Sequence, residues 1–226
     1  MTKQTIEPIK RSTLSSMVTE RLRELVIAGS YEPGTQLSEV DLAERFGVSR
    51  GPIREGLQRL VQEGLLRSEP HRGVFIPVIS ADDVHDIYLA REAIEGAAVK
   101  AICAREDHAA ITAPLLRLVR EMEKSAPAQR WSEVADLDMR FHLELVRAAG
   151  SKRLSRMFGT LIDETRSLLS LTAADPGRED RVVEHAQIAR ALENGDLDAA
   201  MAALGRHFAD SRLSAGIQGN GGRRGA

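Results

Sequence analysis

The chain has 226 residues, of which 42% are hydrophobic and 28% are charged, a composition typical of a soluble globular protein with one large domain or two small ones. Its formal net charge of −2 means that any attraction to nucleic acid must come from local clusters of Arg and Lys. The single cysteine, Cys103, excludes an intramolecular disulfide, and no apolar stretch approaches the roughly 18 residues of a membrane helix, so we expect a cytoplasmic protein that is neither exported nor embedded in a membrane.

Helical periodicity dominates the chain from its first folded segment. Apolar residues recur at helical spacing within 14–26, and Gly29 ends this helix. A short second helix is expected over 38–47, and Ser49 is placed to N-cap a third helix over 50–64. Two short helices joined by a tight turn, after a longer first helix, predict a trihelical helix-turn-helix unit.

A short hairpin then interrupts the helical pattern. Two small apolar runs within 66–77 flank a turn that contains Pro, His, Arg and Gly, and a domain boundary follows near 78–81. The polar segments 1–10 and 218–226 at the two termini are expected to fray. Downstream of the boundary, Gly, Pro and capping residues divide the pattern into six predicted helices, at about 82–106, 110–126, 129–149, 151–173, 177–194 and 196–215.

The predicted fold class is therefore mainly α, in two domains. We expect residues 11–78 to form a winged helix-turn-helix with a small β-hairpin, and residues 82–215 to form an all-α six-helix bundle. The sequence contains no phosphate-cradling glycine loop, so an ATP-driven role is not expected.

The outward face of the third helix predicts contact with DNA. Arg50 and Arg54 lie there, and within 45–60 the only acidic side chain is Glu55. A helix N-terminus attracts phosphate through its unpaired N–H groups, and Arg donates bidentately to guanine O6 and N7. Together with Ser49, these arginines are the principal candidates for reading an operator.

The hairpin supplies a second candidate contact. Its tip presents Arg72 beside Gly73 on a narrow turn, a shape suited to insertion into a minor groove. Two other interpretations stay open at this point. The arginines can form a solvated charged face, and helix-turn-helix geometry also occurs in modules that bind only protein.

These segments resemble the winged helix-turn-helix of the GntR family of transcriptional regulators. The resemblance covers about 11–78 and is carried by LSEVDLAERFGVSRGPIREGLQRLVQEGLL, with RGVFI after it and GSYEPG before it. Relatives often carry Arg where Val40 stands in this chain, so one contact of the family pattern is missing. The resemblance implies a recognition helix over 50–64 and, as contacts with operator DNA, Ser49, Arg50, Arg54, Arg72 and Gly73.

Four side chains of the second domain predict a metal site. Asp138 and His142 are four residues apart on one apolar helical face, so both point inward. His185 and His207 each lie on the apolar face of a later predicted helix. Taken singly, an inward histidine is more often a hydrogen-bonded core residue. Burying all four unpaired is costly, however, and three imidazoles with one carboxylate suit Zn²⁺, Ni²⁺ or Mn²⁺.

The second domain also resembles a known ligand-binding domain. The predicted ligands stand in DLDMRFH, EHAQIARALENGDLDAA and MAALGRHF, which resemble the metal-binding segments of the FCD domain. That domain is the all-helical half of FadR-like GntR regulators, and the resemblance spans about 82–215, with six helices as in its smaller VanR-type version. An octahedral metal leaves two positions for water or for the carboxylate of a small effector.

Arg91 lies within the apolar face of the helix predicted at 82–106, one turn before Glu95. A charge that faces a core needs a partner, and two interpretations are open. Arg91 pairs with Glu95 at i,i+4 spacing, or it binds the carboxylate of an effector bidentately beside the metal.

These patterns predict a homodimeric transcriptional repressor rather than an enzyme. Two recognition helices that read the half-sites of a palindrome cover more base pairs than one, and a small organic acid in the bundle is expected to weaken operator binding. Two rivals remain. An Asp/His₃ metal site with open positions also serves oxygenases and hydrolases, and a closed site is typical of a metal-storing or structural bundle.

Overall fold

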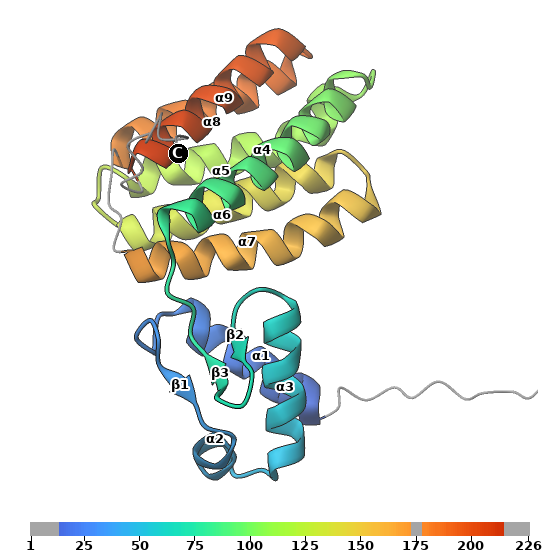
Figure 1. Cartoon of the computed structure of the whole chain (residues 1–226). Coiled ribbons are helices and arrows are strands. Elements are labelled where there is room, and N and C mark those ends of the chain that lie inside the picture. Colours follow the sequence, from blue (N-terminus) through green and yellow to red (C-terminus); the bar gives the residue numbers. More distant parts are fainter. Residues whose placement is uncertain (1–13, 173–177, 215–226) are drawn as a thin grey trace, which may run out of the picture. The chain divides into compact units, whose positions relative to one another are not determined.

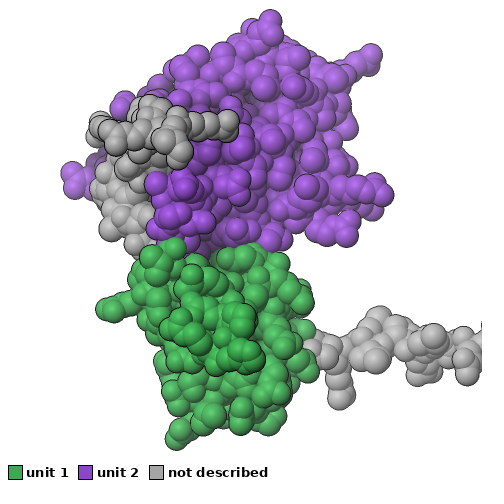
Figure 2. All heavy atoms as spheres, viewed as in Figure 1, with its two compact units in different colours: residues 1–78 green, residues 79–226 purple. Residues whose placement is uncertain are grey.

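The computed structural model describes residues 14–172 and 178–214, and the chain separates into two compact units that divide after Val78 (Figure 2). The segments expected to fray, 1–10 and 218–226, lie outside the described residues, as do the expected helix ends at 173, 177 and 215. Each unit has a hydrophobic core of its own.

The core of the first unit lies between α1 (Leu14–Ile27) and α3 (Arg50–Gln62), which pack against each other (Figure 1). α2 (Glu39–Phe46) packs against α3 and buries Leu42 and Ala43. Both longer helices bury side chains that recur every three or four residues, so each presents one apolar stripe. These buried residues are Val18, Leu22 and Val26 of α1 and Ile53, Leu57 and Leu60 of α3.

Local backbone chemistry sets both ends of α2. The hydroxyl of Ser38 at the N-cap accepts a hydrogen bond from the Asp41 N–H at 3.3 Å. Gly47 ends the helix in the left-handed conformation, with φ 65°, which glycine adopts without steric cost. The predicted span of 38–47 is thus confirmed. Because Val48 alone separates Gly47 from the N-cap residue of α3, Ser49, the turn between the two helices is tight.

A small antiparallel sheet completes the first unit. The predicted hairpin is present as β2 (Arg67–Glu69) and β3 (Gly73–Phe75), and a third strand, β1 (Gln36–Leu37), pairs with the other side of β3. Leu37 of β1 and Ser68 of β2 both lie opposite Val74. The sequence did not predict β1, because two residues are too few to show the alternation of a strand.

The described part of the second unit contains six helices, as predicted, so the mainly α fold class is confirmed. Where the predicted ends lie within the described residues, the observed ends agree with them to within three residues, and the largest difference is at the end of the first helix. The helices are α4 (Ala81–Cys103), α5 (His108–Ser125), α6 (Trp131–Ala148), α7 (Lys152–Thr172), α8 (Arg178–Glu193) and α9 (Leu197–Ser214).

A capping box fixes the beginning of α4. The Ser80 hydroxyl accepts from the Asp83 N–H at 3.2 Å, and the Asp83 carboxylate accepts from the Ser80 N–H at 2.8 Å. Each side chain thus satisfies a backbone donor that the helix itself leaves unpaired. Ser80 is therefore the N-cap residue of α4.

In the bundle α4 packs against α6, α7 and α9, while α5 packs against α6 and α8 (Figure 1). Phe141, Phe158 and Phe208 are among its fully buried side chains. None of the described helices combines the length and apolarity needed to cross a membrane. The core also encloses ionisable groups, which are stable there only if paired or bound to a metal. They are Arg91, Glu95, Asp138, His142, His185 and His207.

Candidate nucleic-acid interface and metal centre

The N-terminal end of α3 carries the residues predicted to contact DNA. Ser49 is at the N-cap position, and the side chains of Arg50 and Arg54 are more than half exposed. The Ser49 hydroxyl makes no capping hydrogen bond, although the sequence suggested one. A capping hydroxyl accepts from the N–H of the second or third helical residue, and the third one here is Pro52, which has no N–H. The Ser49 side chain is therefore not committed to the helix end.

The exposed face of α3 is less cationic than the sequence suggested, because Glu39 of α2 lies against it. Glu39 Oε1 and Oε2 accept hydrogen bonds from Arg54 Nε and Nη2 at 2.9 and 2.8 Å. Oε2 also accepts from Arg50 Nη2 at 3.1 Å. The hydrogen bond from Arg54 is the main reason why the pKa of Glu39 falls to about 2. The segment 45–60 does not include this carboxylate, which the tight turn between α2 and α3 brings to the same surface.

The hairpin of β2 and β3 forms a wing with Arg72 at its exposed tip. The Arg72 guanidinium pairs with Glu69 and lies 5.4 Å from the centroid of the Phe75 ring. Gly73 follows with φ 106°, in a region that favours glycine. Gln36 of β1 donates from Nε2 to the Arg72 carbonyl oxygen at 2.6 Å. The strand that the sequence missed therefore braces the tip of the wing.

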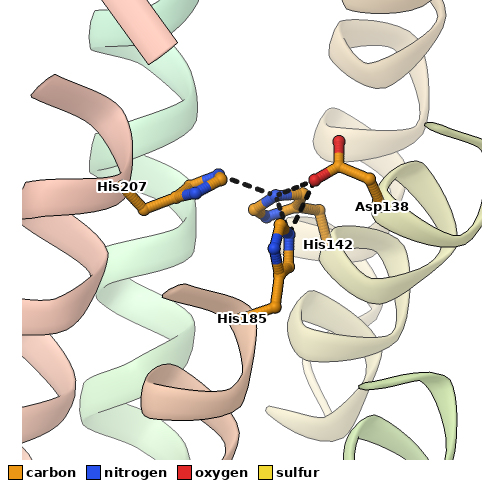
Figure 3. Close-up of side chains that lie close together, drawn as sticks. All are labelled: Asp138, His142, His185 and His207. Atoms are coloured by element: carbon orange, nitrogen blue, oxygen red, sulfur yellow. Dashed lines mark hydrogen bonds and ion pairs between the residues drawn. The ribbon is translucent and has the colours of Figure 1, made fainter. Parts of the chain in front are cut away.

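Three helices of the second unit bring the four predicted metal ligands together (Figure 3). Asp138 and His142 come from one face of α6, His185 from α8 and His207 from α9. All four are buried, and one potential ligand atom from each lies within 4.8 Å of the others. His142 Nε2 lies 3.3 Å from His185 Nε2 and 3.1 Å from His207 Nε2. Asp138 Oδ1 lies 2.7 Å from His185 Nε2.

The second ring nitrogen of each histidine faces a hydrogen-bond acceptor. An acceptor at Nδ1 places the ring proton there and leaves a lone pair on Nε2. Three Nε2 lone pairs that face one another repel, and a cation between them converts the repulsion into coordination. The donor set therefore fits a divalent metal ion. The Nδ1 contacts are 2.5 Å to Glu95 Oε2 from His142, 2.6 Å to the Arg181 carbonyl oxygen from His185, and 2.8 Å to Glu184 Oε2 from His207.

Burial and neighbouring charges shift the pKa values of three of the four groups. Burial, with the charges of His185 and His142, holds the pKa of His207 well below its usual range. Burial opposes ionisation of Asp138, but His185 and His142 still hold its pKa well below the usual range. Burial likewise opposes protonation of His142, yet Glu95 raises its pKa, so a metal that binds there displaces a proton. Asp138 Oδ1 lies 2.7 Å from His185 Nε2 and 3.7 Å from His142 Nε2, so the carboxylate faces both ring nitrogens.

Comparison with protein families identifies the chain. Residues 14–76 match the model of bacterial regulatory proteins of the gntR family, and residues 86–210, more than half of the chain, match the FCD domain. The chain belongs to the GntR family. It is therefore a transcriptional regulator of a family that binds operator DNA, not an enzyme, and the alternative of a metal-dependent oxygenase or hydrolase is set aside.

Relatives of this GntR regulator cover most of its length. The "Probable D-xylose utilization operon transcriptional repressor" of Paenarthrobacter nicotinovorans is 27% identical over 96% of this chain and 95% of its own. An HTH-type transcriptional regulator of Streptomyces ambofaciens is 32% identical over 83% of this chain and 79% of its own. The crystal structure of a GntR transcriptional regulator from Rhodococcus sp. RHA1 is 26% identical, with a TM-score of 0.73, over 89% of this chain and 96% of that one.

Arg91 of the FCD domain forms the ion pair with Glu95 that was one of the two interpretations left open by the sequence. Its side chain is 2% exposed, and Nε donates to Glu95 Oε1 at 3.1 Å. Its guanidinium also lies over the rings of Tyr88 and Phe208, at 5.6 and 5.2 Å from their centroids. Nη2 is buried and makes no hydrogen bond within the described residues. The pair with Glu95 is thus formed, and a donor still remains for another acceptor.

Sequence reasoning missed the carboxylates that support the metal ligands in this GntR regulator. Glu95 was expected only as a partner of Arg91, and its place on the buried face of α4 was a usable signal for a second role. Glu184 was not considered, because it is adjacent to His185 in the chain but accepts from His207 of the neighbouring helix. A pairing between helices leaves no trace in local spacing.

Proposed function

We propose that this GntR regulator is a homodimeric repressor whose operator binding responds to a small organic acid bound beside a divalent metal ion. Zn²⁺, Ni²⁺ or Mn²⁺ suits the donor set. The proposed metal ligands are Asp138, His142, His185 and His207.

The observation that carries the effector site is the buried Nη2 of Arg91, which makes no hydrogen bond within the described residues. A buried guanidinium nitrogen without an acceptor is costly, and a carboxylate accepts from Arg in a charge-assisted, directional way. Arg91 is also joined to the cluster, since Glu95 accepts both from Arg91 Nε and from His142 Nδ1. An acid that coordinates the metal and accepts from Arg91 satisfies both groups at once.

The proposed DNA contacts are in the first unit. Ser49, Arg50 and Arg54 are at the N-terminus of α3, which enters a major groove, and Arg72 with Gly73 enters the adjacent minor groove. One short helix reads few base pairs, so a two-fold dimer that reads two half-sites is the expected assembly. The exposure of Arg50, Arg54 and Arg72 supports this role.

The proposed regulation is a coupling free energy between the binding of the organic acid and the binding of operator DNA. An acid that binds the DNA-free dimer better than the DNA-bound dimer lowers operator affinity by the same factor. The size of the response is then set by the difference between its two affinities.

A thermal-shift screen of metal-loaded protein against lactate, succinate and citrate tests the effector site, because a ligand raises the melting temperature of the state that it binds. The acid with the largest shift is then added to protein bound to a duplex that it selected from a random library, at fixed salt. We expect the acid to weaken DNA binding, and Arg91→Lys, which loses the planar fork, to lose most of this response.

Arg212→Lys is the matched control, since Arg212 pairs with Glu92 in a partly exposed position. An acid shown by calorimetry to bind without changing DNA affinity would refute the regulatory role. Metal-saturated protein that selects no duplex at all would favour the metal-storing or structural bundle.

A further inference from the structure

One carboxylate, Glu39, accepts hydrogen bonds from both arginines that are proposed to read DNA. It lies in the first turn of α2, and the hydroxyl of Ser38 fixes where that turn begins. Arg54 contacts it through Nε at 2.9 Å and Nη2 at 2.8 Å, and Arg50 contacts it through Nη2 at 3.1 Å. The Glu39 side chain is 27% exposed, whereas those of Arg50 and Arg54 are 58% and 55% exposed. The acceptor is thus sheltered and both donors face outward.

The bidentate contact fixes the plane of the Arg54 guanidinium. A guanidinium has five N–H donors in one rigid plane. Glu39 takes the Nε–H and one Nη2–H on one edge, which leaves both Nη1–H groups and the second Nη2–H for other acceptors. The edge formed by Nη1 and Nη2 is the one that can donate to guanine O6 and N7 together. A free Arg side chain must lose rotamer freedom to present that edge, whereas this one is already held.

The charge of Glu39 has a second effect on DNA binding. The two arginines and the helix N-terminus attract any phosphate, whatever the base sequence. A carboxylate among them lowers this general attraction, and the pKa of about 2 keeps it ionised throughout the neutral range. Glu39 therefore favours readout of bases over indiscriminate contact with the backbone.

We propose that Glu39 is a positioning residue for sequence readout, which orients Arg54 and Arg50 for base contact and weakens non-specific binding. The proposal rests on the DNA contacts proposed above. The wing repeats the arrangement, since Glu69 accepts from Arg67 at 2.5 Å and also from Arg72. Both proposed contact elements thus pair one carboxylate with two arginines.

The test compares Glu39→Gln with Glu44→Gln in the full chain. Glu44 is an exposed residue of the same helix, so the charge change is matched while the arginine contacts are kept. Affinities are measured at one salt concentration for the duplex selected by the wild-type protein and for a scrambled duplex of the same composition. We expect Glu39→Gln to lower the ratio of the two affinities roughly tenfold, about the value of one base contact. Glu44→Gln should raise both affinities alike and leave the ratio unchanged.

Arg54→Ala separates failure of this proposal from failure of the proposed contacts. If Arg54→Ala leaves affinity for the selected duplex unchanged, the assignment of the recognition helix is wrong. If it lowers that affinity while Glu39→Gln behaves like Glu44→Gln, the positioning role is overturned. In the Arg54→Ala background, Glu39→Gln should change the ratio much less than in the wild type, whereas a merely structural role of Glu39 would leave its effect intact.

Glu39→Asp covers the case in which the Gln variant does not fold. Asp keeps the charge but is one methylene shorter, so its carboxylate cannot keep the hydrogen bonds to both Arg54 and Arg50. We expect a lower affinity for the selected duplex with an unchanged affinity for the scrambled one. Wild-type values for both duplexes would overturn the proposal.

Discussion

At the scale of the residue, Glu95 connects Arg91 of the proposed effector site with His142 of the proposed metal site. One carboxylate oxygen accepts from Arg91 Nε at 3.1 Å, and the other faces His142 Nδ1 at 2.5 Å. Burial opposes ionisation, but His142 and Arg91 still lower the pKa of Glu95. The carboxylate thereby fixes the His142 ring with Nε2 toward the other ligands, and it also balances a buried guanidinium.

The first prediction is that Glu95→Gln lowers metal affinity about 10–100-fold, the usual effect of losing a hydrogen-bond partner of a ligating histidine. The amide has one acceptor oxygen for two donors, and it carries no charge to support the imidazole. Competition with a chromophoric zinc chelator measures the affinity. Glu92→Gln on the same helix is the control, because Glu92 pairs with Arg212 in a partly exposed position and such a pair is worth little. Equal affinities for the two variants would remove Glu95 from the site.

At the scale of the element, the turn between α8 and α9 connects the helices that carry His185 and His207. Gly195 in this turn has φ 67°, and a Cβ there would lie 2.7 Å from His108 Nε2. The His108 ring is itself held, since Nδ1 lies 3.0 Å from the Glu193 carbonyl oxygen at the end of α8. The close approach of α5 to this turn therefore depends on glycine.

We predict that Gly195→Ala destabilises the bundle more than Gly150→Ala does. Both positions have positive φ, at a cost of ~1–2 kcal/mol for alanine, but at Gly150 the nearest atom to a Cβ is Arg105 Nη1 at an ordinary 3.8 Å. Overpacking against His108 adds about 1–3 kcal/mol. Urea unfolding followed by fluorescence of the single tryptophan, Trp131, which packs on this core, measures both. Equal losses would show that the His108 ring moves at no cost.

At the scale of the whole molecule, the proposed metal and DNA sites belong to different compact units. A bound ion would join α6, α8 and α9 directly, and α4 would be connected to it through the contact of Glu95 with His142. The recognition helix and wing contain none of these ligands. Metal binding is therefore expected to stabilise the helical bundle and to leave the folding of the first unit unchanged.

Chelation tests this expectation by calorimetry. At a free metal concentration of about 100 times Kd, binding adds roughly 2.7 kcal/mol to the folded state, which is worth about 5–10 °C for a unit of this size. A chelator should lower the melting temperature of the bundle by that amount. The double variant His185→Ala, His207→Ala should contain no metal by elemental analysis and show no response. A double variant that keeps its metal and its chelator response would place the metal elsewhere.

The sequence by itself determined the features that depend on local spacing. Helical periodicity and caps such as Ser38 and Gly47 predicted every described helix, because a helix is built from contacts within about four residues. The same spacing placed Asp138 and His142 on one inward face. The resemblances to the winged helix-turn-helix and to the FCD domain then predicted the family of the protein.

Only the tertiary structure decided which groups from different elements meet. A strand of two residues, such as β1, is too short to be predicted from its sequence, because it forms only by pairing with β3. No local sequence pattern predicts the contact of Glu39 with Arg54 or of Glu184 with His207. Such contacts depend on the orientation that the turns give to the helices and on how the helices pack against one another. The sequence therefore named the proposed metal ligands and the arginines proposed to read DNA, and packing between helices decided which carboxylates contact them.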